Sequence, residues 1–235
     1  MSDLNVRRWT GGFGVAAGVL ILVVLALYVA AGSAPRVEDA AKLSQFVTKN
    51  NGLILTISLA DTMNAAFFIA FVAGFRHLLR QARSDYEWVA TLVFGVGLVY
   101  ATLTLIFDTL IGGAALDTVT KAEPVAVRAL IEGSTLVVSS VGLVVVALFL
   151  AAAAFAVLGT GALPRWVGWA GYIGAILNLV AVPTIYGGTD PTGFYTADGY
   201  APLILGTLPY VIWLLIAGIS LLVGKSRAFR AAMPG

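Results

Sequence analysis

The sequence has 235 residues, of which 60% are hydrophobic and only 11% are charged, and its mean hydropathy is +0.95. A soluble domain carries about twice that share of charged residues and cannot bury so much apolar surface, so the composition excludes a water-soluble globular protein. The net charge of +2 argues against a nucleic-acid-binding surface, while the absence of cysteine and the single histidine, His77, exclude disulfides, thiolate sites and a bis-histidine site within one chain.

Six apolar stretches along the chain are each long enough to cross a bilayer, which takes about 20 mainly apolar residues in a helix. They cover residues of about 11–32, 52–75, 88–111, 126–158, 166–186 and 201–223. The stretches are too long for strands and do not alternate between apolar and polar residues. The sequence therefore predicts an all-α protein, a polytopic membrane helix bundle with six transmembrane helices in a single integral membrane domain over residues 1–235.

The first stretch and the segments between the helices need separate interpretation. Arg7 and Arg8 precede the first stretch as in a signal peptide, but its apolar run of about 22 residues exceeds the usual 7–15 of a signal core, which predicts a retained helix. Residues 37–50 have apolar side chains near helical spacing and predict a helix on the outer membrane surface. Residues 186–200 are rich in Gly, Asp and Tyr and predict an outer, turn-rich loop.

The distribution of Lys and Arg predicts the orientation, because cytoplasmic ends of membrane helices carry more of these residues. Most of the 14 basic residues fall at one set of helix ends, namely Arg7, Arg8, Arg76, Arg80, Arg83, Arg165, Lys225, Arg227 and Arg230. The other set holds Arg36, Lys42, Lys49, Lys121 and Arg128. We therefore expect a multi-pass protein of the cell (cytoplasmic) membrane with both termini cytoplasmic.

Three carboxylates fall within the predicted bilayer depth, where an ionisable side chain costs a few kcal/mol. Asp61, within "LTISLADTMNAAFF", lies near the midplane of the second helix. With a rise of about 1.5 Å per residue, Asp108 lies about one turn, and Glu132 about two turns, below the outer ends of the third and fourth helices. Such groups persist where they face the bundle interior, a partner or water.

Each of these acids belongs to a polar stripe on one helix face, because its polar neighbours recur at spacings of three and four residues. The stripes are Ser58, Asp61, Thr62 and Asn64; Tyr100, Thr104 and Asp108; and Arg128, Glu132, Thr135 and Ser139. Helices in lipid bury such faces against one another, which predicts a polar cavity between helices, open outward and floored near Asp61. The candidate ligand-binding residues are Asp61, Asn64, Asp108, Glu132, Asn178 and Tyr210.

Structural roles compete with these assignments. Arg128 and Glu132 are also spaced as an ordinary i,i+4 ion pair, and Asp61 could be a hydrogen-bonded packing residue. The sequence contains no catalytic motif, so the catalytic residues stay unassigned, and the carboxylates are not spaced as a metal loop. We expect no metal and no cofactor. The expected partners are membrane lipid and a small-molecule or lipid ligand, with no nucleic acid, and the oligomeric state is open.

Several apolar pieces carry a resemblance to a known family. They are "RRWTGGFGVAAGVLILVVLALYV", "FIAFVAGFRHLLR", "LPRWVGWAGYIGAILNLV" and the final "YVIWLLIAGISLL". Over nearly the whole chain the sequence resembles a widespread bacterial family of small polytopic membrane proteins, catalogued only as a domain of unknown function. The resemblance implies a helical bundle in the cytoplasmic membrane and no established activity.

Three functions fit these observations. The first is a protein with an outward-facing cavity for a small cationic or amphipathic molecule. Its role would be binding, sensing or proton-linked transport of that molecule. The second is a membrane-embedded enzyme in which Asp61 acts as an acid on an isoprenoid or other lipid, with Glu132 or Asp108 orienting it. The third is a structural subunit whose polar stripes fix helix register. The enzyme requires a closed, mostly apolar pocket beside Asp61, binding is also compatible with a wet funnel, and a structural subunit predicts no cavity.

Overall fold

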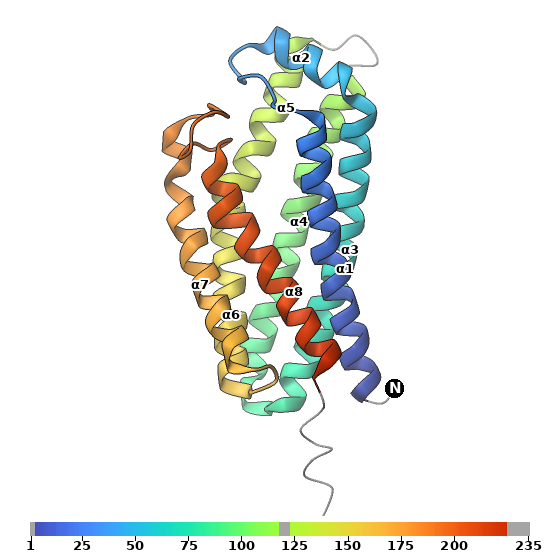
Figure 1. Ribbon diagram of the computed structural model, residues 1–235, viewed down its shortest axis with the longest axis vertical. Helices are drawn as coiled ribbons and strands as arrows, with labels where there is room; N and C mark the ends of the chain where they lie inside the picture. The colour runs from blue at the N-terminus through green and yellow to red at the C-terminus, as the bar shows by residue number, and fades with distance from the viewer. Residues whose placement is uncertain (1–2, 118–122, 225–235) are drawn as a thin grey trace, which may run out of the picture.

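The computed structural model describes residues 3–117 and 123–224, and within these ranges the chain forms helices and no strand (Figure 1). The first three spans are α1, Asp3–Ala31; α3, Asn51–Ala82; and α4, Glu87–Asp117, which follows the short 3₁₀ helix η1, Ser84–Tyr86. The fourth span comprises α5, Pro124–Leu136; the π-helix η2, Val137–Gly142; and α6, Leu143–Thr160. The last two are α7, Arg165–Ala181, continued by the 3₁₀ helix η3, Val182–Gly187; and the π-helix η4, Pro202–Thr207, continued by α8, Leu208–Val223. The six predicted transmembrane helices are confirmed as six helices long and apolar enough to span a membrane.

Backbone chemistry explains why the apolar runs become uninterrupted helices, since a helix satisfies its own N–H and C=O groups where no water is available. Residues with special backbone preferences stand at several ends. Pro124 opens α5, and Pro164 precedes α7. Gly161 ends α6 in the left-handed conformation with φ of +66°, which only glycine adopts without strain.

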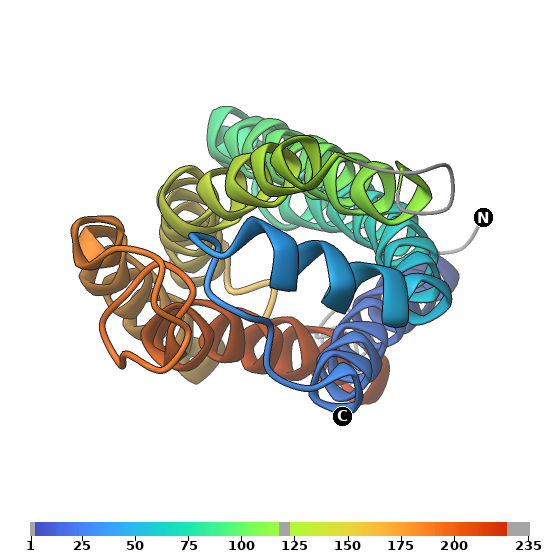
Figure 2. The same ribbon diagram turned by 90° about the horizontal axis from the view of Figure 1, so that it is seen from above.

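The spans form a ring in the order α1, α3, α4, the α5–α6 span, α7 and α8, as the view along the bundle shows (Figure 2). Extensive contacts join α1 to α3, α3 to α4, and α6 to α7, and α8 closes the ring against α1. The start of α1 and the end of α8 lie at the same end of the bundle (Figure 1). Arg7 connects them there, because its guanidinium donates to the carbonyl oxygens of Leu221 at 3.2 Å and Ser220 at 3.3 Å.

Glycines allow α1 and α8 to cross at close range near this end. A Cβ added at Gly218 would lie 2.8 Å from the backbone nitrogen of Val15 and 2.9 Å from the carbonyl oxygen of Gly11. At Gly18 it would lie 2.6 Å from a side-chain carbon of Leu215. Small residues at membrane helix crossings let the backbones approach, and the resulting dispersion attraction is a main source of helix association in lipid. The α1–α8 contact is therefore fixed by backbone-to-backbone packing.

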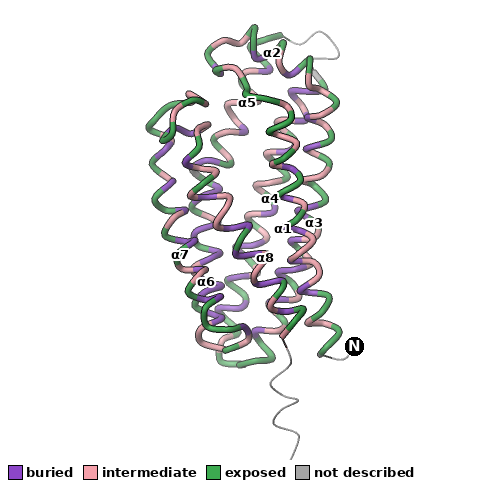
Figure 3. Tube along the Cα trace, viewed as in Figure 1, coloured by how far each residue is buried: buried purple, intermediate pink, exposed green. Residues whose placement is uncertain are grey.

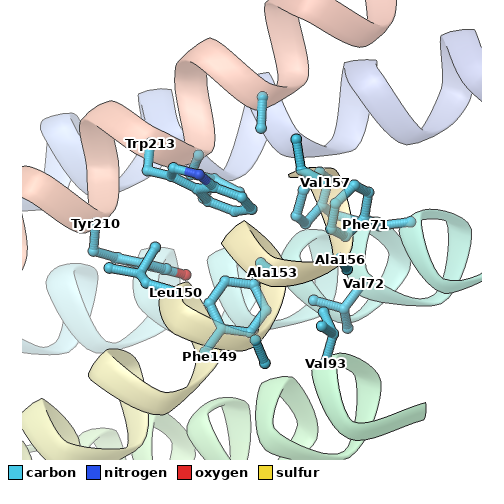
Figure 4. Close-up of a cluster of buried hydrophobic side chains, with 14 of the residues drawn as sticks. Phe71, Val72, Val93, Phe149, Leu150, Ala153, Ala156, Val157, Tyr210 and Trp213 are labelled. Carbon is cyan, nitrogen blue, oxygen red and sulfur yellow. The ribbon is translucent and has the colours of Figure 1, made fainter. Parts of the chain in front are cut away.

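Large aromatic side chains fill the centre of the bundle (Figure 4). Phe149 packs edge-on against Trp213, with ring centroids 5.6 Å apart, and Phe68 packs edge-on against Phe149 at 5.4 Å and Tyr210 at 5.9 Å. All four side chains are almost completely buried. Buried residues follow the inward faces of the long helices, and the outward faces are exposed over most of their length (Figure 3).

The helix expected near residues 37–50 forms as α2, Ala40–Lys49. Asp39 caps it by accepting a hydrogen bond from the backbone N–H of Lys42 at 3.1 Å. Its apolar residues Leu43 and Val47 are buried, and Val47 belongs to a cluster formed with α3, α4 and α5. The helix thus lies across the end of the bundle opposite the start of α1 (Figure 2).

The orientation of the bundle in the membrane is open to a direct test because the chain has no cysteine. We expect Tyr186→Cys, at a residue that is 91% exposed, to react with a membrane-impermeant maleimide in intact cells. Ser84→Cys, exposed at the opposite end, should react only after the membrane is permeabilised. The reverse pattern would show that the positive ends of the helices face outward.

Candidate ligand-binding pocket

A pocket of about 170 Å³ lies inside the ring, and every membrane span contributes to its wall. Its polar lining residues are Tyr28, Asp61, Asn64, Tyr100, Thr104, Asn178, Thr207 and Tyr210. The rest of the wall is mainly apolar, with Ile21 and Val24 from α1 and Leu103 and Phe107 from α4 among the residues that form it. Polar groups on an apolar wall are the usual arrangement in a site for a small organic molecule.

Asp61 and Asn64 of α3 form the acidic part of the pocket. They are three residues apart, so they lie on one face of the helix, and the Asn64 amide nitrogen donates to an Asp61 carboxylate oxygen at 3.1 Å. The Asn64 amide oxygen is buried and has no hydrogen-bond partner among the described residues. Within the described part of the chain, Asp61 is the only carboxylate in the lining, which contains no lysine, arginine or histidine. The pocket wall therefore contains a carboxylate next to an amide oxygen that has no partner among the described residues.

Asn178 of α7 occupies the opposite side of the pocket and is completely buried. Its amide nitrogen donates to the carbonyl oxygens of Gly174 at 2.9 Å and of Gly206 at 3.2 Å, so that it links α7 to η4. Its amide oxygen is buried without a partner in the described part of the chain. Asn178 thus combines a structural link with a second acceptor at the pocket.

Tyrosine rings from α4 and α8 meet beside these polar groups. The rings of Tyr100 and Tyr210 are 5.1 Å apart in an edge-on arrangement, and Tyr210 also packs on the aromatic centre of the bundle. Aromatic faces attract cations within about 6 Å through the ring quadrupole. Tyr100, Tyr210 and Phe107 therefore add a weak preference for positive charge to that of Asp61.

Two π-helical segments, η2 in the fourth span and η4 in the sixth, border the pocket. Val137, Val138 and Gly142 of η2 and Gly206 and Thr207 of η4 belong to the lining. π-helical turns are rare and are often found at functional sites. At Gly206 a Cβ would meet the end of the Leu143 side chain, so glycine leaves room for Leu143 where η4 approaches α6.

Four of the six residues expected at a site line the pocket, namely Asp61, Asn64, Asn178 and Tyr210. Asp108 is not part of the lining. It is 6% exposed on α4 and accepts a hydrogen bond from Thr62 of α3 at 3.2 Å. Thr62 directly follows Asp61 in the chain. Asp108 therefore packs against the part of α3 that carries Asp61, but it lies outside the pocket lining.

Glu132 is also outside the pocket lining. Its carboxylate pairs with the guanidinium of Arg128 at 2.8 Å, and both side chains are about two-fifths exposed. This is the i,i+4 ion pair that the spacing indicates, at a partly exposed position on α5. The structure does not bring Glu132 together with Asp61.

Tyr28 is a lining residue that the sequence pattern did not single out. It lies on α1, and its hydroxyl is buried without a partner among the described residues. A lone tyrosine near the predicted end of a membrane helix is typical of an interfacial anchor, so nothing in its position signalled the pocket. The sequence pattern did not predict the two π-helices either. Pro202, Gly206 and Pro209 in the sixth span are nevertheless residues that favour an irregular helix.

The segment between α7 and α8 is held close to the bundle by two aspartates outside the spans. Hydrogen bonds from the hydroxyl and N–H of Thr192 lower the pKa of Asp190, and the ion pair with Arg36 at 2.5 Å lowers it further. Burial raises the pKa of Asp198, and a hydrogen bond with Thr135 opposes that rise. The segment thus reaches the linker after α1 and the fourth span.

The fold defines this chain as a multi-pass helical membrane protein. It belongs to the family described as domain of unknown function (DUF4386), whose model matches residues 16–218. The match covers all six spans in whole or in large part, as the resemblance noted in the sequence predicts. No curated protein and no solved structure gives a significant match to the chain.

Proposed function

We propose that the protein resides in the cell membrane and binds a small amphipathic cation in the pocket, with the ammonium group against Asp61. The observation that carries the proposal is the composition of the described lining, which has one carboxylate, two buried amide oxygens without partners and no basic residue. An unpaired buried charge is costly, and a bound cation would offset that cost.

The size and wall of the pocket support the same ligand class. A cavity of about 150 Å³ holds a molecule the size of benzene, so the volume of about 170 Å³ suits a group of similar size. Apolar side chains of α1 and α4 would contact the hydrocarbon part, and the rings of Tyr100 and Tyr210 would flank the charge. A structural subunit has no need of such a pocket.

The proposal is tested with cyclohexylamine and cyclohexanol, which have nearly the same shape but differ in charge at neutral pH. With the purified protein in lipid nanodiscs, we expect cyclohexylamine to raise the melting temperature in a saturable way. Cyclohexanol should bind at least about tenfold more weakly, since a charge-assisted hydrogen bond is roughly twice as strong as a neutral one. Equal effects of the two compounds would contradict an ionic role for Asp61.

A second candidate is acid catalysis on an isoprenoid, which the aromatic faces beside Asp61 favour. Tyr100, Tyr210 and Phe107 would stabilise a carbocation in the same way as an ammonium group. Asp61 would add its proton to an alkene carbon, and loss of a proton from a neighbouring carbon to Asp61 would complete an isomerisation. Formation of an isomer that depends on Asp61, with no binding of cyclohexylamine, would favour this candidate.

A further inference from the structure

The pocket is closed toward the end of the bundle where α1 starts. Phe68, Phe71, Phe149 and Trp213 lie between the pocket and that end, and each is at most 1% exposed. They form stacked and edge-on pairs with one another, including Phe71 with Trp213 at 6.5 Å (Figure 4). A ligand cannot pass this packed layer without displacing several large rings.

At the opposite end of the bundle, α2 lies over α5, α3 and α4. Leu43 and Val47 of α2 are 1% and 2% exposed, which shows that the helix packs down on the bundle. Arg36 of the linker pairs with Asp190 of the segment before η4 at 2.5 Å. The view along the bundle shows α2 lying across this end (Figure 2).

Around the ring, the α1–α8 boundary differs from the others. The two helices are held together by the crossing at Gly11, Gly18 and Gly218, which extends from near the start of α1 to its middle. Beyond this crossing they diverge (Figure 1), and η4 packs mainly against α7, α8 and α6. The pocket is lined on one side of this divergence by α1 and on the other by η4 and α8.

Partly exposed residues line the pocket at this boundary, as Val138 does elsewhere in the wall. Leu25 and Tyr28 on α1 and Thr207 on η4 line the pocket, yet each keeps partial exposure. Ile204, in the same segment as Thr207, is 44% exposed and does not belong to the pocket lining. The α1–η4 boundary therefore lies between the pocket and the outer surface of the bundle.

We propose that the ligand is a long-chain amine dissolved in the bilayer, whose ammonium group enters the pocket sideways and whose chain extends into the lipid between α1 and η4. This inference rests on the proposed function and adds the class of ligand. A pocket of about 170 Å³ holds the ammonium end and a short part of the chain, and the remainder needs an apolar exit. The boundary between α1 and η4 offers such an exit directly into the bilayer.

The position of the chain can be mapped with dodecylamine that carries a diazirine at the end of its chain. The probe is photolysed with the protein in nanodiscs, and its adducts are located by mass spectrometry, with and without excess cyclohexylamine. We expect the adducts that cyclohexylamine suppresses to concentrate on residues 21–31 and 202–207. The matched control is dodecanol with the same diazirine, which should give only adducts that cyclohexylamine does not suppress.

Chain length gives a second measurement. The dissociation constants of hexylamine, decylamine and dodecylamine, each expressed as a concentration of the amine in the membrane, should agree within about threefold. A chain that lies between α1 and η4 exchanges one apolar environment for another, so its length has little effect. An enclosed pocket would instead bind the longer amines about tenfold or more weakly than hexylamine, since overpacking is costly.

The outcomes separate the two proposals. Suppressible adducts on α2, or rejection of the longer amines while cyclohexylamine binds, would overturn the lateral route and leave the proposed function standing. A failure of cyclohexylamine to bind, with no amine of any length showing saturable binding, would instead overturn the proposed function and the inference with it.

Discussion

Asp61→Asn should strongly weaken the binding of cyclohexylamine, while the protein still folds with a melting temperature close to that of the wild type. The amide keeps the shape of the carboxylate and can still hydrogen-bond with Asn64, but it removes the negative charge. Loss of a charge-assisted contact in a low-dielectric pocket costs about 1.5–3 kcal/mol, or roughly 10- to 150-fold in affinity. The measurement is a thermal-shift titration in nanodiscs.

Two further variants distinguish the effect of the Asp61 charge on binding from the effect of Asp61 on stability. Asp61→Leu should lower the stability by about 1–3 kcal/mol, because it leaves the Asn64 amide without its partner in a buried site. Asp85→Asn makes the same acid-to-amide change at a carboxylate paired with Arg83, far from the pocket lining, and should leave binding unchanged. Binding by Asp61→Asn at wild-type affinity would remove Asp61 from the site.

Gly218→Ala should destabilise the bundle by about 1–3 kcal/mol, although alanine is the better helix former by about 1 kcal/mol. The added methyl carbon would lie 2.8 Å from the backbone nitrogen of Val15 and 2.9 Å from the carbonyl oxygen of Gly11. Backbone atoms cannot rotate aside, so α1 and α8 must separate, which weakens the dispersion attraction along their crossing. The free energy of unfolding in mixed micelles titrated with a denaturing detergent measures the loss.

Gly12 provides the matched control because it belongs to α1, the helix that Gly218 meets, and an added Cβ meets no atom within 4 Å. Gly12→Ala should be neutral or slightly stabilising, as expected for alanine in an uncrowded helical position. Similar losses in the free energy of unfolding for Gly12→Ala and Gly218→Ala would contradict this prediction. They would show that the contacts at Gly218 do not determine how closely α1 and α8 approach.

The hydrophobic pattern was sufficient to predict the six spans because their lengths are fixed by bilayer thickness and backbone hydrogen bonding, which are local properties. The helix near residues 37–50 was predictable for a similar reason, since its apolar side chains follow the helical period. Asp61 and Asn64 could be expected on one face because three residues are close to one helical turn. Each of these predictions depends on residues close together in the chain.

Contacts between spans could not be predicted in this way. The spacing of Glu132 fits both a pocket residue and an ion pair with Arg128, and only the packing of α5 shows the pair beside rather than inside the pocket. Asp108 and Asp61 have similar polar neighbours in the sequence, yet only Asp61 belongs to the lining. Helical spacing defines a face, but the direction of that face depends on which helices adjoin it.

The membrane class, the six helices and the residues that share a helix face were predictable without the structure, because hydrophobicity and helical period depend only on the order of residues in the chain. Tertiary structure alone decided that Tyr28, Asn178 and Tyr210 would surround Asp61, since they come from different spans. It also decided the divergence of α1 from η4, which follows from the close glycine crossing at Gly218. In lipid the apolar faces of different helices are nearly equivalent, so detailed packing, and not hydrophobicity, selects their neighbours.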